Sequence, residues 1–535
     1  EGVSVIVYVQ TCAAEKRRRR KRGTFPDPAE RLFINPSVCE GCGDCGVQSN
    51  CVSLLPLETN LGRKRQIDQS SCNKDFSCVN GFCPSFATVK GGHLRRPTAQ
   101  NIVVPDLPMP NLPVIAGTHN VVITGVGGTG VVTIGALLAM AAHLDGKAAG
   151  VMEMAGLAQK GGAVHIHCRI GETPEDISAI RVALGECHTL IGGDLVVSAQ
   201  GSTLGLMASA GAAVVNNHEI ITGDFTRDIG FHIPRADLEL AICARLNTHA
   251  TLINATKLAE NTLGDTVYAN MILLGAAFQQ GLLPISEPAF LEAISLNGAK
   301  VTQNQQAFAF GRWCIVDPDV STRFQMEKPV EQDSEVARLA NLAAYGSGRS
   351  ESYVQMRAEM GDAPLTAQVL QSYHKVLTYK DEYEVARLLC KTKEMVAKRF
   401  EGDFKISYHL APPLMSRIGP NGRPQKRRFG AWFDHASRGL ARLKFLRETP
   451  LDIFGYTAER RMERQLITDF ENLVARMQRE YDPANHDVWY ELMGLPQNIL
   501  GFGPVKLANA QAMAKRWGEL LQELDQNGPS AQFAS

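Results

Sequence analysis

Seven of the chain's 13 cysteines fall between residues 39 and 83, and this clustering constrains the fold more than any other feature of the 535-residue sequence. Such a density suggests disulfides in a small secreted protein, but a chain of this length can build cores without cross-links. Spacings of the CxxC kind favour metal ligation in a reducing compartment instead. We therefore expect residues 31–97, which have little apolar content, to be held together partly by bound metal.

The first cysteine run is CEGCGDC, in which three cysteines follow one another at intervals of three residues. This spacing is typical of a loop that presents three thiolates to an iron–sulfur cube, whose fourth iron takes a ligand from elsewhere. In two-cluster ferredoxins a later cysteine of each run serves the other cluster. The run therefore predicts a 4Fe–4S cluster with the ligands Cys39, Cys42, Cys45 and Cys83.

The second run, SCNKDFSC, has the same spacing but carries Asp75 where the middle cysteine is expected. A carboxylate also binds iron, although its oxygen is a harder ligand than sulfur. We expect either an aspartate-ligated 4Fe–4S cluster or a 3Fe–4S cluster, with the ligands Cys51, Cys72, Asp75 and Cys78. Zinc sites that use three or four of the cysteines each are the alternative, but CxxCxxC is more typical of iron–sulfur proteins.

An uncharged stretch from Val121 to Ala142 is long enough to cross a bilayer, but the glycines of GVGGTG interrupt it. A buried strand, a glycine turn and a buried helix explain this pattern better. The turn is similar to a dinucleotide-binding turn, with an acid at the end of the next strand candidate. Its candidate cofactor-binding residues are Gly125, Gly127, Gly128, Gly130 and Glu153. Alternatively, the glycines only permit close strand-to-helix packing.

Short β-rich segments alternate with helical ones between residues 119 and 313, which predicts a mainly parallel sheet covered by helices. The strand candidates are NVVITGV, KAAGVMEM, AVHIHCRI, CHTLIGG and AAVVNN. Beyond about residue 330, long amphipathic patterns predict a mostly helical region. The α/β chain is thus divided into a strand (Val3 to Val9) with a basic connector in 1–30, a ferredoxin-like module in 31–97, a Pro-rich linker in 98–118, a Rossmann-like domain in 119–313 and a helical extension in 314–535.

The charge balance excludes a strong global field, because 55 basic and 55 acidic residues give a formal net charge of zero. Neither nucleic acid nor a membrane is therefore expected as a partner. The basic run EKRRRRKR, Glu15 to Arg22, is interpreted as a solvated connector. A sharper hypothesis is that its charge offsets nearby anionic clusters or attracts an acidic electron carrier.

The cysteine module, the linker and the segment NVVITGVGGTGVVTIGALLA with MEMAGLAQKGGAVHIHCRI resemble the 2-oxoacid:ferredoxin oxidoreductases. Within that family they resemble the C-terminal half of the fused bacterial indolepyruvate ferredoxin oxidoreductases. The resemblance spans most of the chain. Residues 1–30 resemble the end of the thiamine-diphosphate domain, 31–97 the ferredoxin insert, 119–313 the gamma domain and 314–535 the C-terminal extension.

The resemblance implies that a 2-oxoacid such as indolepyruvate, CoA and oxidised ferredoxin give acyl-CoA, carbon dioxide and reduced ferredoxin. It implies that thiamine diphosphate and Mg²⁺ bind an upstream domain or chain, because their GDG motif is absent from this sequence. It further implies a cytoplasmic homo-oligomer with ferredoxin as electron acceptor, and a gamma domain that packs against the thiamine site. Catalytic residues are not identified; the candidates for facing that site are Gln159, Gly161 and Gly162.

Two other functions fit the same residues. One is a stand-alone iron–sulfur carrier or scaffold subunit that docks to a separate catalytic chain. The other is an iron–sulfur flavin or NAD(P) oxidoreductase that uses the glycine turn as its dinucleotide site. Titration with NAD(P)H, FAD and CoA separates these functions, because reduction by NADH without a partner favours the last.

Overall fold

A computed structural model of the chain describes residues 3–95, 102–127, 130–153, 162–219, 230, 232–325, 334–346, 348–412, 416–419 and 422–527. The chain divides into two compact units, the first made of Glu1–Phe25 with Arg96–Lys328 and the second of Pro26–Arg95 with Pro329–Ser535. Among the described helices, none combines the length and the apolar character needed to cross a bilayer.

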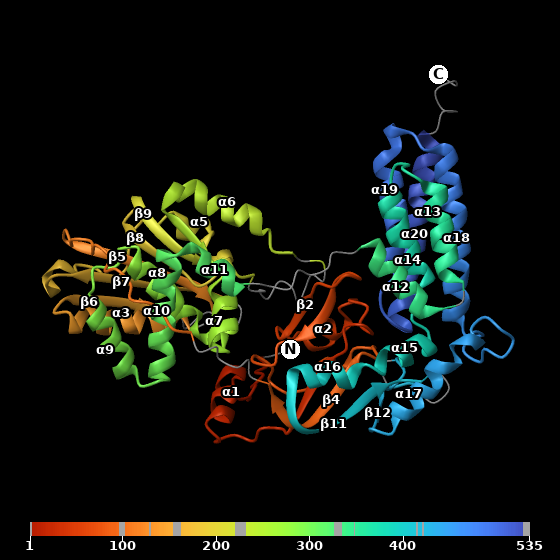
Figure 1. Ribbon diagram of the computed structural model, residues 1–535, viewed down its shortest axis with the longest axis horizontal. Coiled ribbons are helices and arrows are strands. Elements are labelled where there is room, and N and C mark those ends of the chain that lie inside the picture. Colours follow the sequence, from red (N-terminus) through yellow and green to blue (C-terminus); the bar gives the residue numbers. More distant parts are fainter. Residues whose placement is uncertain are drawn as a thin grey trace. The chain divides into compact units, whose positions relative to one another are not determined.

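The first unit is built on a six-stranded sheet with the order β10-β9-β8-β5-β7-β6 (Figure 1). Its strands are β5 (Thr118–Val126), β6 (Ala148–Glu153), β7 (Ala163–Gly171), β8 (Cys187–Gly192), β9 (Met207–Asn216) and β10 (Ala250–Ile253). All five segments predicted as strands between residues 119 and 313 form strands. β5, β8, β9 and β10 are parallel neighbours, whereas β7 runs antiparallel to β5 and β6. The sheet is mixed because residues 154–162, which join β6 to β7, are too few for a parallel crossover.

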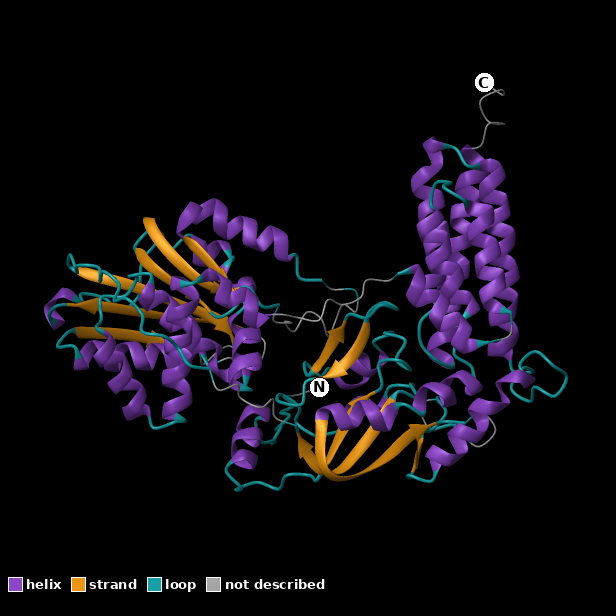
Figure 2. Cartoon of the chain, viewed as in Figure 1, coloured by secondary structure: helices purple, strands orange, loops and turns teal. Residues whose placement is uncertain are grey.

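Helices cover both faces of this sheet (Figure 2). One face carries α3 (Val131–Leu144), α7 (Ala255–Leu263), α8 (Ala269–Gln279), α9 (Glu287–Asn297) and α10 (Val301–Val316), and the other carries α4 (Leu195–Ser198) and α6 (Arg235–Leu246). Alternate residues of β5 reach the two cores, with Ile123 in the first and Val122 in the second. This alternation is what a strand covered on both sides requires.

Helix α8 is buried along most of its length and lies unusually close to α10. A Cβ at Gly275 would lie 2.0 Å from the Phe308 carbonyl oxygen, and a Cβ at Gly311 would lie 2.0 Å from the Ile272 carbonyl oxygen. Only glycine allows this approach of the two backbones. Helix α10 also continues past residue 313, where the sequence-based domain boundary falls, and the compact unit extends to Lys328.

The remaining parts of the first unit are short helices and extended segments. The helices are α1 (Ala13–Lys21), α5 (Gly201–Leu204) and α11 (Pro318–Gln325). The strand expected at Val3 to Val9 is not formed; these residues are exposed, and in the described chain no strand pairs with them. Backbone groups without a ladder partner stay hydrated instead. In the linker, the Pro108 carbonyl oxygen accepts hydrogen bonds from Gln279 and Arg312.

The second unit contains a four-stranded antiparallel sheet with the order β1-β4-β11-β12. Its strands are β1 (Glu30–Ile34), β4 (Phe86–Leu94), β11 (Phe400–Leu410) and β12 (Arg427–Phe429), and a separate hairpin is formed by β2 (Leu54–Leu57) and β3 (Lys64–Ile67). Figure 1 shows the orange β4 beside the cyan β11, although more than 300 residues separate them. Tyr408 of β11 lies opposite Ala87 of β4.

The cysteine module therefore shares its core with residues from far along the chain. Phe86 and Val89 from the module pack in one cluster with Val396, Ile406 and Tyr408. The helical extension thus contains a strand that sequence periodicity did not identify. This strand and the helices beside it supply apolar contacts that residues 31–97 lack by themselves.

Most of the remaining second unit is helical (Figure 2). Its helices are α2 (Asp44–Ser49), α12 (Glu335–Tyr345), α13 (Arg349–Met360), α14 (Thr366–Leu377), α15 (Glu382–Leu389), α16 (Thr392–Arg399), α17 (Phe433–Arg442), α18 (Ala458–Glu480), α19 (His486–Gly494) and α20 (Pro504–Asn527), with the 3-10 turn η1 (Ser77–Asn80). A core that includes Tyr353, Phe470 and Trp489 joins α13, α18 and α19. The predicted helical texture of this region is confirmed, apart from β11 and β12.

Candidate metal centre

The first cysteine loop, Cys39 to Cys45, passes twice through left-handed backbone before it enters α2. Gly41 has φ of 75° and Gly43 has φ of 73°, values that favour glycine. A side chain at Gly41 is also excluded by space, because its Cβ would lie 2.3 Å from the Arg63 carbonyl oxygen. The Gly41 N–H donates to Cys39 Sγ at 3.4 Å.

The second loop, Cys72 to Cys78, repeats this backbone without any glycine. Lys74 and Phe76 have φ of 51° and 63°, at the positions that correspond to the two glycines of the first loop. The left-handed region costs a residue with a Cβ about 1–2 kcal/mol, so other interactions hold the second loop in this shape. The Lys74 N–H donates to Cys72 Sγ at 3.4 Å, matching the bond at Cys39.

Asp75 lies between the two left-handed residues of its loop, as Cys42 does in the first loop. The backbone N–H of Ser77 donates to Asp75 Oδ1 at 3.1 Å. Likewise, the backbone N–H of Asp44 donates to the Cys42 sulfur. The carboxylate thus occupies the position of a thiolate and receives the same kind of hydrogen bond.

The neighbours of each thiol divide the eight candidate ligands into two groups. Cys39 and Cys83 are electrostatic neighbours of both Cys42 and Cys45. We call the first group the buried group, and its members are Cys39, Cys42, Cys45 and Cys83. The neighbours of Cys78 are the other members of the second group, which consists of Cys51, Cys72, Asp75 and Cys78. The structure therefore brings the later cysteine of each run to the opposite run.

The two groups differ in their exposure to water. In the buried group Cys39, Cys45 and Cys83 are buried and Cys42 is half-buried. In the second group only Cys78 is buried, Cys51 and Cys72 are half-buried, and Asp75 is exposed. We call the second group the outer group. Burial, together with neighbouring thiols, raises the pKa of Cys78 to about 12 and that of Cys83 to about 11. Because metals bind thiolates, loading either group must displace protons.

Buried charges surround the buried group. Glu40 is 3% exposed and forms ion pairs with Lys375, in the last turn of α14, and with Lys380, just after that helix. Burial alone would raise the pKa of Glu40, but Lys375 and Lys380, together with Lys64 and Lys506, outweigh it and hold the pKa well below its usual value. Arg65 is also buried and is an electrostatic neighbour of Cys45. The surroundings of the thiols thus suit an anionic bound group.

The donor set fits an iron–sulfur cluster in chemistry and in loop geometry. Thiolates are the usual ligands of such clusters, and the paired loops offer them four to a group. No three His, Cys, Asp or Glu side chains among the described residues lie within reach of one metal ion. The ligands of a cluster surround several atoms and are spread more widely than those of a single ion.

Sequence reasoning did not identify the cations near the cysteines. Lys426 Nζ donates to the carbonyl oxygens of Gly81, at 2.5 Å, and Cys83, at 3.2 Å. Arg423 Nη1 lies 2.9 Å from Asp44 Oδ1. Both basic residues belong to the turn RIGPNGRPQKRRFG, whose density of basic residues was the available signal.

The glycine turn lies at the end of β5, beside the end of β8, where the strand order of the sheet reverses. Open α/β sheets bind ligands at such a point. Gly130 has φ of 85° and begins α3, and the Gly127 N–H donates to the Gly162 carbonyl oxygen at 2.8 Å. The structure thus brings Gly162 to the turn. Gly128, Gln159 and Gly161 lie outside the described residues.

Glu153 is placed differently from the acid of a dinucleotide site. It ends β6, and β7 lies between β6 and β5. In dinucleotide-binding folds the acid ends the strand next to the one that carries the glycine turn. The glycine turn here therefore fits close packing better, since a Cβ at Gly130 would lie 2.5 Å from Asn270 Nδ2.

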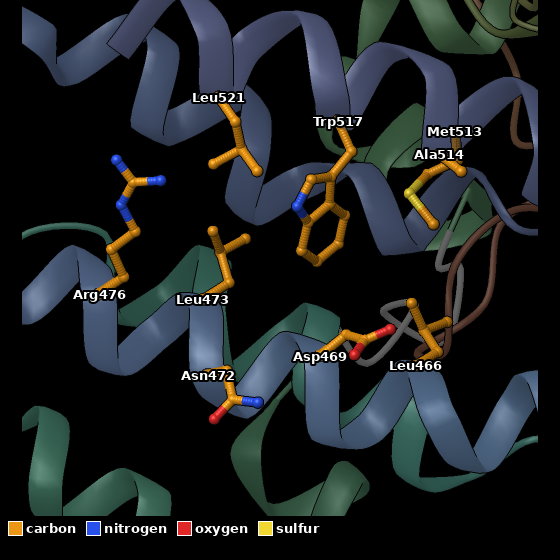
Figure 3. Close-up of a pocket in the computed structure, with 9 residues that line it drawn as sticks. All are labelled: Leu466, Asp469, Asn472, Leu473, Arg476, Met513, Ala514, Trp517 and Leu521. Carbon is orange, nitrogen blue, oxygen red and sulfur yellow. The ribbon is translucent and has the colours of Figure 1, made fainter. Parts of the chain in front are cut away.

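A groove of about 420 Å³ opens between α18 and α20 (Figure 3). Leu473 and Trp517 line it from opposite helices. The charged residues that line it have other partners, since Asp469 accepts from Gln465 and Arg476 pairs with Glu480 and Asp525. The groove includes none of the candidate ligands.

The first unit is an α/β domain with a glycine turn where the strand order reverses, and the second carries the paired cysteine loops. Residues 120–313 match the family model described as pyruvate ferredoxin/flavodoxin oxidoreductase. By this match and the relatives that follow, residues 120–313 form a domain similar to those of the 2-oxoacid:ferredoxin oxidoreductases. Residues 339–519 match a second model, described as a family of unknown function, DUF6537.

Curated relatives have related names. The chain is 26% identical over 199 residues to indolepyruvate oxidoreductase subunit IorB of Archaeoglobus fulgidus. This alignment covers 36% of the present chain and 92% of that protein. It is 27% identical over 195 residues to the subunit of the same name from Thermococcus kodakarensis. That alignment covers 36% of the present chain and 94% of the relative.

Two solved structures are similar to part of the chain. The gamma subunit of a keto/oxoacid ferredoxin oxidoreductase from Geobacter sulfurreducens is 22% identical, covers 37% of this chain and 98% of its own, and has a TM-score of 0.27. The 2-oxoglutarate:ferredoxin oxidoreductase of Magnetococcus marinus is 16% identical, covers 48% of this chain and 46% of its own, and has a TM-score of 0.28.

Proposed function

We propose that the chain is the electron-transfer and gamma portion of a thiamine-diphosphate-dependent oxidoreductase that acts on an aryl-pyruvate such as indolepyruvate. The reaction consumes the 2-oxoacid, CoA and oxidised ferredoxin and yields acyl-CoA, carbon dioxide and reduced ferredoxin. The names of the relatives support the substrate class. The observation that carries the proposal is the pair of loops with matching backbone, around which the eight candidate ligands form two groups of four.

In this proposal Cys39, Cys42, Cys45 and Cys83 hold one iron–sulfur cluster, and Cys51, Cys72, Asp75 and Cys78 hold the other. When bound, the clusters supply one-electron transfer between the thiamine site and ferredoxin. The protein shields the buried group from water and donates backbone N–H groups to its sulfurs. The outer group lies nearer to solvent, which suits exchange of electrons with an external carrier.

The thiamine diphosphate and Mg²⁺ belong, in this proposal, to a partner domain or chain. The substrate test uses the native complex, isolated anaerobically through a tag on this chain. It is assayed for CoA-dependent reduction of ferredoxin with indolepyruvate, phenylpyruvate, pyruvate and 2-oxoglutarate. Faster turnover of the aryl substrates by at least tenfold supports the proposal, whereas a preference for pyruvate or 2-oxoglutarate contradicts the assigned substrate class.

The ligand assignment is tested with a matched pair of cysteine variants. Cys83→Ser removes a buried thiol of the buried group, and Cys243→Ser removes a half-buried thiol from α6 that lies outside both groups. We expect only Cys83→Ser to lose one of the two iron–sulfur signals in electron paramagnetic resonance. Equal iron content and spectra in both variants would exclude Cys83 as a ligand.

The carrier-only and nicotinamide alternatives remain testable with the same preparation. The place of Glu153, two strands from the glycine turn, does not favour a nicotinamide site. NADH is therefore expected to leave the clusters oxidised in the absence of other proteins. Reduction by NADH alone supports the nicotinamide enzyme, and a tagged chain that isolates without any thiamine-binding partner supports the carrier.

A further inference from the structure

A basic segment of the C-terminal region is anchored on the cysteine module at three points. We call residues 422–429 the basic strap. Arg423 pairs with Asp44 at 2.9 Å, and Arg428 pairs with Glu30 at 2.9 Å. Between these two anchors, Lys426 Nζ donates to the carbonyl oxygens of Gly81 and Cys83. The strap thus connects a region matched to a family of unknown function with the candidate cluster sites.

Lys426 differs from the two arginines of the strap in the groups that its charged side chain contacts. Each arginine faces a carboxylate, whereas the ammonium of Lys426 contacts only neutral carbonyl oxygens at hydrogen-bond distance. In the described part of the chain no carboxylate lies within ion-pair distance of it. Its ammonium also lies 5.0 Å from the centre of the Phe86 ring, over one face. The carboxylate among its electrostatic neighbours is Asp44, which pairs with Arg423 and forms no ion pair with Lys426.

The thiols that Lys426 influences belong to both ligand groups. Its electrostatic neighbours are Cys83 and Cys45 of the buried group and Cys78 of the outer group. Cys45 and Cys78 are themselves electrostatic neighbours, so the two groups adjoin each other at this point. A Cβ at Gly81 would lie 2.7 Å from the Cys45 Cα, which shows how closely η1 approaches α2. Lys426 therefore lies where the two groups meet.

We propose that Lys426 is a positioning residue that places a fixed positive charge between the two ligand groups and raises the reduction potential of the clusters they hold. This inference rests on the proposed function. Reduction adds one negative charge to a cluster, and a nearby cation stabilises the added charge in a medium of low dielectric. The C-terminal region would then set the electron affinity of the electron-transfer site, in addition to completing its sheet through β11.

The test compares three variants in redox titrations followed by electron paramagnetic resonance, after anaerobic reconstitution of the full chain with iron and sulfide. Lys426→Gln removes the charge but keeps a hydrogen-bond donor, Lys426→Arg keeps both, and Lys405→Gln removes an exposed lysine of β11 as the control. We expect Lys426→Gln to lower the reduction equilibrium constant of at least one cluster about tenfold, which is 59 mV for one electron. Lys426→Arg and Lys405→Gln should stay near the wild-type potentials.

The outcomes separate this inference from the function on which it rests. A wild-type chain that holds no iron–sulfur cluster overturns the proposed function. Assembled clusters whose potentials are the same in Lys426→Gln and wild type overturn the inference alone. If Lys426→Gln loses its clusters, Lys426→Arg decides: wild-type potentials support the role of the charge, and lost clusters or shifted potentials overturn it.

Discussion

Replacing Glu40 with Gln removes the carboxylate that Lys375 and Lys380 share beside the first cysteine. The Glu40 side chain is 3% exposed, and Lys64 is a further positive neighbour. The glutamine keeps the shape of the side chain but no longer offsets the lysines. The substitution therefore leaves buried positive charges without their anion, which is the costly way to break a buried ion pair.

The size of this effect follows from the exposure of the partners. Breaking a buried pair costs about 3–5 kcal/mol. Lys375 and Lys380 retain 26% and 14% of their side-chain exposure, so some hydration remains and we expect the lower end, about 3 kcal/mol. The control is Glu30→Gln, which breaks the more exposed pair with Arg428 and is expected to cost less than about 1 kcal/mol.

Urea unfolding followed by tryptophan fluorescence measures both variants. Three of the four tryptophans lie in the second unit, which reports on the region that Glu40 joins to the helices; they are Trp432, Trp489 and Trp517. We expect the unfolding midpoint to fall clearly for Glu40→Gln and to change little for Glu30→Gln. Equal losses below about 1 kcal/mol in both variants would refute the argument from burial.

Three further predictions address other parts of the molecule. Asp75→Cys supplies a thiolate at the position that matches Cys42, so the outer cluster should retain iron better. Its electron paramagnetic resonance spectrum should also change, and an unchanged spectrum means that Asp75 does not touch iron. Gly275→Ala forces apart α8 and α10 and should lower the free energy of unfolding of the first unit by about 1–3 kcal/mol. The control Gly201→Ala, whose Cβ meets open space, should leave that free energy unchanged. A Gly275→Ala variant as stable as wild type in thermal unfolding contradicts this packing. Burial raises the pKa of Glu382 from 4.5 to about 7, although Arg460 opposes this shift. The folded state therefore binds the Glu382 proton more tightly than the unfolded state does, and the free energy of unfolding should fall as pH rises from 4.5 to 7. Glu382→Gln should lose that contribution in urea titrations at several pH values, and an unaltered pH dependence argues against it.

The parts of the fold that depend on local patterns could be predicted from the sequence. The strand, glycine turn and helix around Gly125 follow from a buried apolar run interrupted by glycines. The direction of β7 did not follow, because it depends on the length of the connection rather than on residue type. Strand β11 could not be assigned to the cysteine module, since it pairs with β4 across more than 300 residues and one sequence carries no signal for that pairing.

In the candidate site, too, local features could be predicted from the sequence and long-range ones could not. The spacing of each run predicts the three ligands in its loop, because the loop is short and its geometry is local. The fourth candidate of each group, Cys83 or Cys51, is expected from the pattern of two-cluster ferredoxins. The left-handed residues Lys74 and Phe76 give no sequence signal of their shape, since neither is glycine. Likewise, Glu40 and Lys426 read as ordinary surface charges until the fold buries the one and places the other beside Cys83.

The most direct test of the central claim is metal and sulfide analysis of the anaerobically purified chain, combined with Mössbauer spectroscopy after enrichment with ⁵⁷Fe. Two ligand groups predict about seven or eight irons per chain with a similar amount of acid-labile sulfide, in two spectroscopically distinct clusters. A chain that contains zinc and no labile sulfide would contradict the account.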